Sequence, residues 1–403
     1  MKKHCITLII FLSIILTSCE MMYFSTNKTS HIEAKQTIKT FDHLKEPIVI
    51  TMPVYKRKNL FGNKNLSEQL KMLGHIFVVI DIETDSVYDW IYFPCEYYTN
   101  WRCSEIGTNP TIYCSAGAYG GPIGCLNPTK TTLDIYEDVD FDMGIMNEIA
   151  TGREIILPKF YYSEEEEHVV LEMNIFDIGT QTFKKPENVL LTNGIGYMSA
   201  PYPDNEGKFW FLHTTYEDIN QLRYLDIEEV VISDVLAEFP YHIGEKKYVN
   251  NVDYVDNKYI YVLHSQLGTE VAKEENVYIF DKYDLSAESM CLSVPDELDM
   301  KGYYLYKISN INGKVYGIFP GEEGQKQTVR FAEINIDEKA IKSLDVVMDF
   351  DLTETIYPRG NRLYLMNSRN ISNVFYTYYD FETGEIGEII NIKYEDIIGG
   401  ASF

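Results

Sequence analysis

The chain has 403 residues, and 61 Asp and Glu against 35 Lys and Arg give it a formal net charge of −26. A surface of this sign repels nucleic-acid phosphates and anionic lipid headgroups, which excludes nucleic-acid binding as a default function. Hydrophobic residues make up 45% of the chain and aromatic residues 14%, which excludes disorder caused by low hydrophobicity. The 32 Tyr and 20 Phe favour pleated, half-buried strands and predict an all-β fold.

Residues 1–18 carry the pattern of an export signal. A basic start precedes an apolar run of eleven residues over 6–16, which is too short to span a bilayer. The sequence Leu16-Thr17-Ser18-Cys19 that ends the run resembles a bacterial lipobox, in which Cys19 carries the lipid. We therefore expect a signal peptide over 1–18, lipidation at Cys19 and a tether over 19–35. An ordinary secretory signal is the alternative.

The residue after Cys19 helps to predict whether a lipoprotein stays at the inner membrane or reaches the outer membrane. It is Glu, not the Asp that retains some lipoproteins at the inner membrane. We therefore expect a lipid-anchored protein of the bacterial cell envelope, at the periplasmic or surface face of the outer membrane.

A short motif recurs along the chain: Asp or Asn, an apolar residue, a few variable residues and a second apolar residue. Its copies lie about 50 residues apart, which is the period of a four-stranded propeller blade. We predict a single β-propeller domain over 36–403, built from four-stranded antiparallel blades. Seven blades are the first choice, six or eight are possible, and two stacked sandwich domains are the rival fold. The copies begin at Asp81, Asp134, Asp177, Asp226, Asp284, Asn335 and Asp380.

A second signal precedes the later copies of this motif. A turn rich in Gly or Asn is followed by a basic residue and by alternating apolar and aromatic residues, which is typical of a strand. We expect the basic residue to open the second strand of a blade, and the Asp motif to form the turn between the third and fourth strands. The basic positions are Lys208, Lys258, Lys314 and Arg362.

The turn Asp-x-x-Thr-Gly-x-apolar at Asp380–Ile386, with the related Asp81–Val87 followed by Trp90, resembles the repeat of quinoprotein-like propellers. That family includes an outer-membrane assembly lipoprotein. The resemblance extends over most of 36–398 as a degenerate repeat. It implies the propeller fold, and because no residue of a quinone site can be carried over, we expect no cofactor.

Propeller geometry assigns the loops of this chain to two faces. The loops between second and third strands and the connections to the next blade share one face, here called the loop face, while the tight turns share the other. The loop-face segments are long and variable, which makes this face the candidate binding surface. They are 56–74, 94–128, 163–168, 213–221, 264–276, 320–328 and 367–373.

The largest of these segments, 94–128, is predicted to be a Cys-rich insertion. Its cysteines Cys95, Cys103, Cys114 and Cys125 lack the close pairs of a zinc site. In an exported chain they predict two disulfides, in any of three pairings. The aromatic residues of the insertion suit contacts to a sugar or a protein, or else pack beneath the loop. They are Tyr97, Tyr98, Trp101, Tyr113 and Tyr119.

Two charged stretches fall on the loop face. Lys56, Arg57 and Lys58 form a dense basic stretch, which suits an acidic partner or a glycan. Glu164–Glu167 form an acidic block. Solvated turns are the alternative interpretation of both.

The chain carries no recognisable catalytic motif: no Gly-x-Ser-x-Gly elbow, His-Glu-x-x-His, P-loop or Gly-x-Gly-x-x-Gly. His213 and His264 each end a predicted second strand on the loop face, as candidate binding residues or as histidines satisfied within the fold. We expect no metal and no catalytic residue, and predict a lipid-anchored module that binds an envelope protein or glycan. The alternatives are an envelope glycan hydrolase or lyase acting in the central channel, and a structural subunit of an envelope assembly complex.

Overall fold

Strands make up nearly all the regular structure that the computed structural model describes, and its helix α3 (Asp296–Asp299) is four residues long. The structure describes residues 30–33, 48–57, 70–93, 100–103, 112–115, 123–127, 132–136, 149–150, 154–165, 167–177, 182–191, 197–199, 201–240, 242–243, 246–266, 276–285, 289–299, 302–352, 355–370 and 373–393. No helix in these ranges is long and apolar enough to cross a membrane.

The described strands form seven antiparallel sheets, numbered here by their place along the chain. The first sheet contains β2 (Ile48–Arg57), β3 (Leu70–Asp81) and β4 (Ser86–Phe93); the second contains β1 (Ser30–Glu33), β5 (Asn100–Cys103), β6 (Ile112–Ser115), β7 (Ile123–Asn127) and β8 (Thr132–Tyr136). The third contains β9 (Ile149–Ala150), β10 (Glu154–Ser163), β11 (His168–Asp177), β12 (Thr182–Lys184) and β13 (Val189–Leu191). The fourth contains β14 (Tyr197–Met198), β15 (Tyr202–Pro203), β16 (Lys208–Thr214), β17 (Ile219–Asp226), β18 (Val231–Ile232) and β19 (Ala237–Pro240). The fifth contains β20 (His242–Ile243), β21 (Lys246–Val255), β22 (Tyr259–Gln266), β23 (Asn276–Asp281) and β24 (Met290–Ser293). The sixth contains β25 (Lys307–Ile311), β26 (Lys314–Glu323), β27 (Lys326–Asn335) and β28 (Ala340–Asp349); the seventh contains β29 (Thr355–Arg359), β30 (Arg362–Asn370), β31 (Asn373–Asp380) and β32 (Ile390–Lys393).

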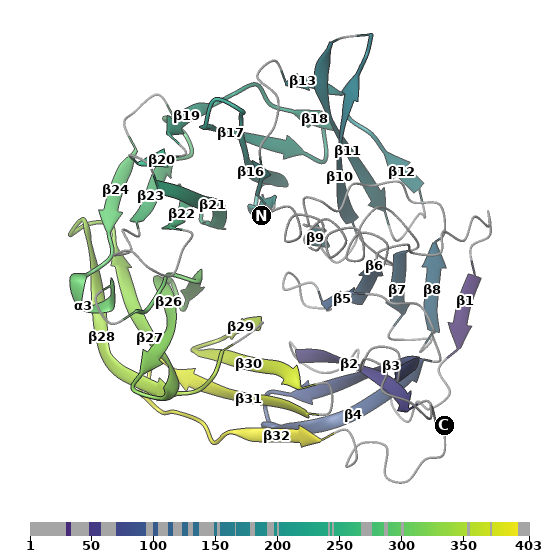
Figure 1. Cartoon of the computed structure of the whole chain (residues 1–403), viewed down its shortest axis with the longest axis vertical. Coiled ribbons are helices and arrows are strands. Elements are labelled where there is room, and N and C mark those ends of the chain that lie inside the picture. Colours follow the sequence, from purple (N-terminus) through teal and green to yellow (C-terminus); the bar gives the residue numbers. More distant parts are fainter. Residues whose placement is uncertain are drawn as a thin grey trace, which may run out of the picture.

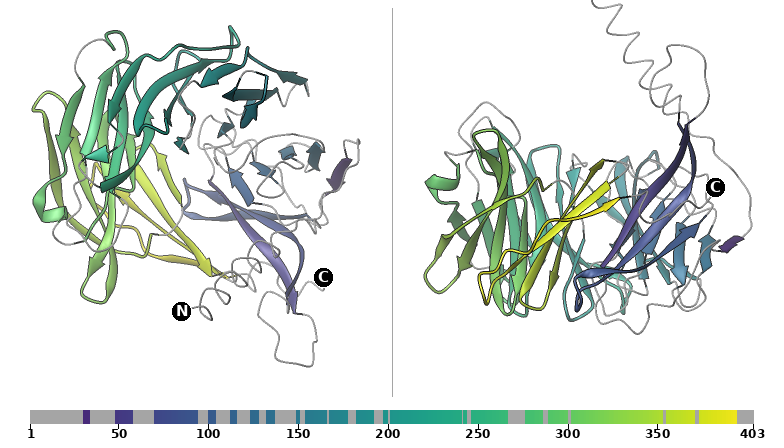
Figure 2. Two further views of the ribbon diagram at one scale, coloured as in Figure 1. Left: turned by 45° about the horizontal axis from the view of Figure 1, so that its top comes forward. Right: turned by 90° about the horizontal axis from the view of Figure 1, so that it is seen from below.

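The sheets stand around a common centre, and the seventh lies beside the first (Figure 1). Their strands run between the two faces of the ring, so the turns gather on those faces (Figure 2). The sixth and seventh sheets have the strand order of a four-stranded meander. These features confirm the all-β propeller fold, while the number of blades stays a prediction.

The hydrophobic core lies between neighbouring sheets. Ile156 and Leu171 of the third sheet share a fully buried cluster with Phe211 of the fourth. Similar clusters join the fourth sheet to the fifth, the fifth to the sixth and the sixth to the seventh. Val78 and Tyr376 belong to a cluster that joins the first sheet to the seventh and so closes the ring. From the third sheet round to the first, the described interfaces between neighbouring sheets are therefore packed apolar contacts.

Side chains at the ends of third strands cap the turns that follow, as the repeat predicted. Oδ1 of Asp226 accepts hydrogen bonds from the backbone N–H groups of Glu228 and Glu229, each at 3.0 Å. The motif therefore marks a locally satisfied turn. Equivalent bonds are made by Asn335 and Asp380, and by Asp81 at the end of β3, the middle of the three described strands of the first sheet.

Two copies of the motif lie elsewhere than predicted. In the fifth sheet the capping residue is Asp281, which ends β23 and accepts a hydrogen bond from the backbone N–H of Tyr283. The predicted copy at Asp284 therefore lies three residues after the residue that caps the turn. Asp134 lies inside β8 and not in a turn. The apolar residue expected after the capping Asp is Lys282 in the fifth sheet, which is why the pattern there pointed to the wrong residue.

The second sheet differs from the prediction for its part of the chain. The segment 94–128, expected as an insertion, supplies β5, β6 and β7 to the ring of sheets. These strands have four or five residues each, too few for a clear alternation of apolar and polar residues. Within the range expected as a tether, β1 pairs with β8 at the edge of the same sheet.

Candidate functional site

The β10–β11 hairpin of the third sheet carries the first part of the candidate site. It projects from the ring at the upper edge of Figure 1. Near its tip, Tyr162 is 62% exposed and Tyr161 is 37% exposed. The hydroxyl of Tyr161 accepts a hydrogen bond from Nδ2 of Asn188 at 3.2 Å, so Tyr162 is the freer of the two rings. The described glutamates of the tip are all exposed: Glu164, Glu165 and Glu167.

Tyr162 continues an apolar stripe that lower down packs against the fourth sheet. Alternate residues of a strand share one face, so Ile156, Phe160 and Tyr162 point the same way. Ile156 is fully buried in the cluster shared with the fourth sheet, and Phe160 packs at the margin of that cluster. Val169 lies opposite Tyr162 in β11 and also packs at this margin. The stripe therefore runs out of the interface between the sheets into solvent.

The fourth sheet has a matching loop, 215–218, between β16 and β17. Because β14 and β15 both pair with β16 on the side away from β17, β16 and β17 are the second and third strands of this sheet. Tyr216 is 70% exposed in this loop, and Glu217 and Asp218 are exposed beside it. The last residue of the loop has a positive φ, 60° at Asp218, and so has the last residue of the hairpin loop, 54° at Glu167. Glycine takes this conformation more readily than an acidic residue does. Because both loops follow second strands of neighbouring sheets, their tyrosines and acids lie at the same end of those sheets.

His213 lies below this surface, inside the fold. Its place in β16, two residues after Phe211, turns the ring toward the third sheet, where it is 1% exposed. The expectation that His213 belongs to the binding surface is therefore wrong, although the strand ends at the expected face. Nδ1 of His213 has no hydrogen-bond partner among the described residues. Burial, together with the positive charge of Arg223, lowers the pKa of His213 to about 4, so the ring is neutral at neutral pH.

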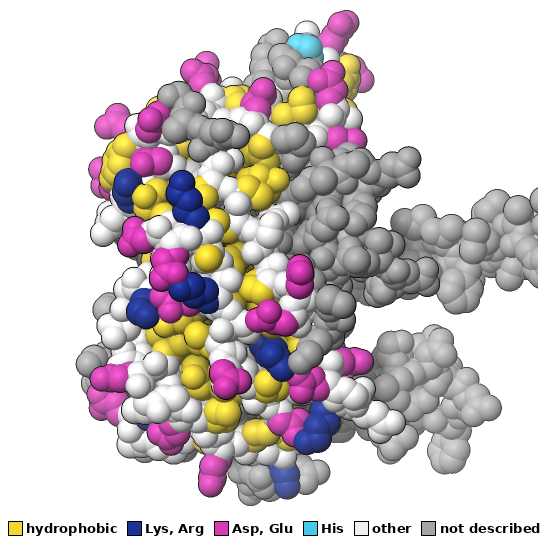
Figure 3. All heavy atoms as spheres, turned by 90° about the vertical axis from the view of Figure 1, so that its left-hand side faces the viewer, with side chains coloured by type: hydrophobic (Ala, Val, Ile, Leu, Met, Phe, Trp, Pro, Cys, Tyr) yellow, Lys and Arg dark blue, Asp and Glu magenta, His cyan; other side chains and the backbone are white. Residues whose placement is uncertain are grey.

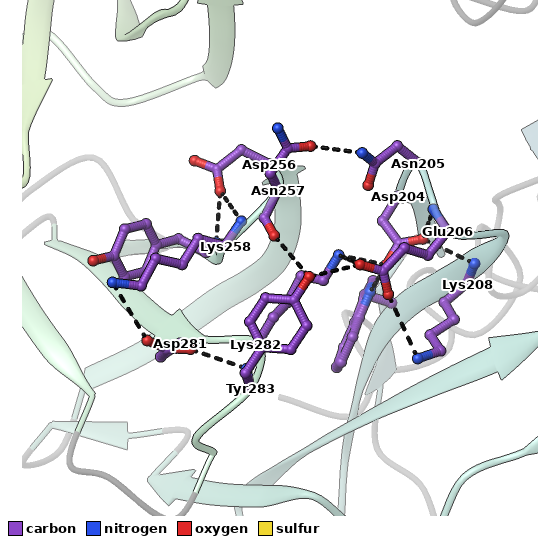
Figure 4. A network of polar contacts seen from close by, with 12 residues as sticks. Asp204, Asn205, Glu206, Lys208, Asp256, Asn257, Lys258, Asp281, Lys282 and Tyr283 are labelled. Carbon is purple, nitrogen blue, oxygen red and sulfur yellow. Dashed lines mark hydrogen bonds and ion pairs between the residues drawn. The ribbon is translucent and has the colours of Figure 1, made fainter.

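The opposite face of the ring holds a polar network between the fourth and fifth sheets (Figure 4). Nζ of Lys282 lies 2.9 Å from Oδ2 of Asp204 and 3.4 Å from Oε1 of Glu206. The side chains of Lys282 and Asp204 are 2% and 0% exposed. Burial raises the pKa of Asp204, but hydrogen bonds from Trp210, from backbone N–H groups and from Lys282 outweigh it, and the pKa is lowered. This buried Lys282–Asp204 pair is therefore an ion pair within the fold.

The rest of the network joins the same turns. The hydroxyl of Tyr283 lies 2.7 Å from Oε1 of Glu206 and 3.1 Å from the carbonyl oxygen of Asn257. Nδ2 of Asn205 donates to Oδ1 of Asn257 at 2.6 Å. Since these groups bind one another across two sheets, the network clamps the sheets together.

The structure describes only part of the predicted site. Some residues lie outside the described ranges: Cys19, Lys58, Cys95, Tyr97, Tyr98 and Tyr119. Others are described in their strands alone: Lys56 and Arg57 in β2, Trp101 and Cys103 in β5, Tyr113 and Cys114 in β6, Cys125 in β7, and His264 in β22. The strand register places Tyr113 opposite Cys125. The disulfide pairing stays a prediction.

The sequence interpretation missed the exposed tyrosines Tyr161, Tyr162 and Tyr216, although it placed their loops correctly. A signal was available, because a tyrosine stands one or two residues before consecutive acids at both hairpin tips. Within the described ranges, no group of three His, Cys, Asp or Glu side chains could hold a metal ion.

No protein-family model and no curated protein matches the chain. Among solved structures, it is similar to an oligogalacturonate lyase in complex with manganese, at 8% identity over 85% of each chain and a TM-score of 0.46. It is also similar to the β-propeller domain of the Trilobed protease from Pyrococcus furiosus, at 12% identity over 85% of each chain and a TM-score of 0.40. A third is the complex of KlAtg21 with the coiled coil of AgAtg16, at 11% identity, 73% of this chain, 90% of that chain and a TM-score of 0.42. At these identities the likeness is one of fold.

Proposed function

We propose that the protein is a lipid-anchored β-propeller of the bacterial cell envelope that binds an envelope protein or glycan through its loop face. The observation that carries this proposal is the exposure of Tyr162 and Tyr216 on neighbouring sheets, at the ends of second strands. Tyrosine offers a large, rigid contact area together with a polar hydroxyl group, and this combination is enriched at binding surfaces. A rigid ring of sheets holds the two loops in place, as recognition loops require.

The anchor part of the proposal rests on the sequence around Cys19 and on the apolar run before it. A lipid at Cys19 would leave the folded ring at the membrane surface, with its loops free to meet a partner. The acidic net charge of −26 fits this setting, because it opposes adhesion of the ring to anionic headgroups.

Site-specific photocrosslinking in the producing bacterium tests the binding surface. A photoreactive phenylalanine analogue replaces Tyr162 in one full-length variant and Tyr216 in another. Val231, which is 51% exposed and opens β18 after a tight turn, is the matched control on the opposite face. We expect a crosslinked adduct at 162 and 216 and none at 231. Absence of an adduct at both tyrosine positions, or equal labelling at 231, would refute the proposed function.

A further inference from the structure

We infer that the partner of this surface is a protein segment rich in Lys and Arg, which docks along the flank of the β10–β11 hairpin that faces the fourth sheet. The inference rests on the proposed function and specifies the chemistry of the partner. Two features of the surface carry the inference: an exposed apolar stripe on β10, and the negative charge of the acidic residues around it.

The apolar component is the upper end of the stripe on β10. Ile156 is fully buried, Phe160 is partly buried and Tyr162 is 62% exposed, so burial falls steadily toward the tip. Val169 stands opposite Tyr162 and is partly exposed as well. Lys and Arg have long aliphatic stems that pack on such apolar surface while their charges stay in water. Their cationic heads are also attracted to the face of a tyrosine ring.

The electrostatic component comes from both loops. The sequence holds six acids and neither Lys nor Arg within 160–168 and 214–220. The side of the molecule seen in Figure 3 shows Asp and Glu side chains and no coloured Lys or Arg at its upper end, where the hairpin lies. A neighbouring cation, Lys159, has its Nζ 5.7 Å from the centre of the Tyr161 ring, on the other flank of β10. A patch of this sign attracts cationic partners and speeds their association.

Two of the acids occupy the same place in their loops. Glu167 and Asp218 each hold the left-handed conformation at the end of their loops. The two loops have equal length and begin and end at equivalent points of neighbouring sheets. Each loop therefore ends on an acidic residue, so that both the hairpin and the neighbouring fourth sheet carry negative charge at this end. A basic segment fits this arrangement, whereas an acidic segment would meet repulsion from both loops.

Binding of defined peptides tests the inference directly. The full chain is titrated with a fluorescent 12-residue peptide of alternating Lys and Gly, and with the corresponding Glu and Gly peptide. We expect the Lys peptide to bind and to weaken as salt is raised, because exposed charges are screened beyond about 10 Å at 0.1 M salt. The double variant Glu165→Lys with Glu217→Lys should bind it about tenfold more weakly at low salt.

The matched control is Glu228→Lys with Glu229→Lys, which changes the net charge equally in an exposed tight turn of the fourth sheet. It should retain the affinity of the parent chain. An equal loss in both double variants would mean that the peptide senses only overall charge, and would overturn the inference. Equal binding of the Glu peptide would overturn it too.

The photocrosslinking experiment separates this inference from the proposed function. Mass spectrometry of the adducts at 162 and 216 identifies the partner segment that is attached. An attachment site flanked by several Lys or Arg residues supports the inference. An adduct to a glycan, or to a segment without excess basic residues, would refute the inference and leave the proposed function standing. Absence of any adduct would refute the proposed function itself.

Discussion

Replacing His213 with glutamine should remove a pH-dependent part of the stability of the ring. In the folded chain the imidazole is 1% exposed and has a pKa of about 4, against 6.5 for an ordinary histidine. Between these values the unfolded chain binds a proton that the folded chain does not. Stability is therefore fully present above pH 6.5 and falls as the pH drops toward 4. The full effect is about 3 kcal/mol, of which about 2 kcal/mol is felt at pH 5.

The assay is urea unfolding of the parent chain and of His213→Gln at pH 8 and pH 5. Between these two values the parent should lose about 2 kcal/mol more unfolding free energy than the variant does. His168→Gln is the control, because His168 lies partly exposed at the start of β11. It should keep the pH dependence of the parent. Equal losses in the parent and in His213→Gln would refute the reasoning, whatever the stability of the variant at pH 8.

Substitutions at three further positions test the fold and its anchor. Gly321→Ala would place a Cβ 2.4 Å from the buried ring of Tyr303, and should lower the free energy of unfolding by about 1–3 kcal/mol in urea titrations. Lys282→Met should cost about 3 kcal/mol in the same titrations, because Asp204 would keep its buried charge without its cation, whereas Lys282→Arg should retain part of that stability. Cys19→Ser should move the protein from the membrane fraction to the soluble fraction after lysis, and continued dependence on detergent would contradict lipidation.

The parts of the fold that the sequence predicted are those decided by local chemistry. The cap at Asp226 lies within three residues of the N–H groups that it binds, so its signal survives in the sequence. In the fifth sheet, local sequence does not predict the turn correctly. Lys282 occupies a position that is apolar in the other turns, and its burial is explained by Asp204, which lies in a different sheet. An ion pair between two sheets does not recur from repeat to repeat, so the repeat pattern of the sequence cannot predict it.

The sequence predicted which loops form the candidate site, but not which side chains are exposed there. The alternation of β10 predicts which residues share a face with Ile156, but not how far the neighbouring sheet covers that face. Exposure of Tyr162 depends on this coverage, and so does the burial of His213 on the adjoining sheet. His213 was expected on the binding surface and is buried, whereas Tyr162 was not predicted and is exposed, because the boundary between interface and solvent is a property of the packed pair of sheets.

The closure of the ring uses the same position of the repeat as the other interfaces between sheets. The residue after the capping Asp packs in the cluster shared with the preceding sheet: Ile82 of the first sheet lies against the seventh, and Phe381 of the seventh lies against the sixth. The closing interface adds a charged contact, in which Nη1 of Arg362 lies 2.9 Å from Oδ2 of Asp85. All described strands of the seventh sheet come from 355–393, and all those of the first from 48–93. Among the described residues, side-chain packing and this ion pair therefore join two sheets that lie far apart along the chain.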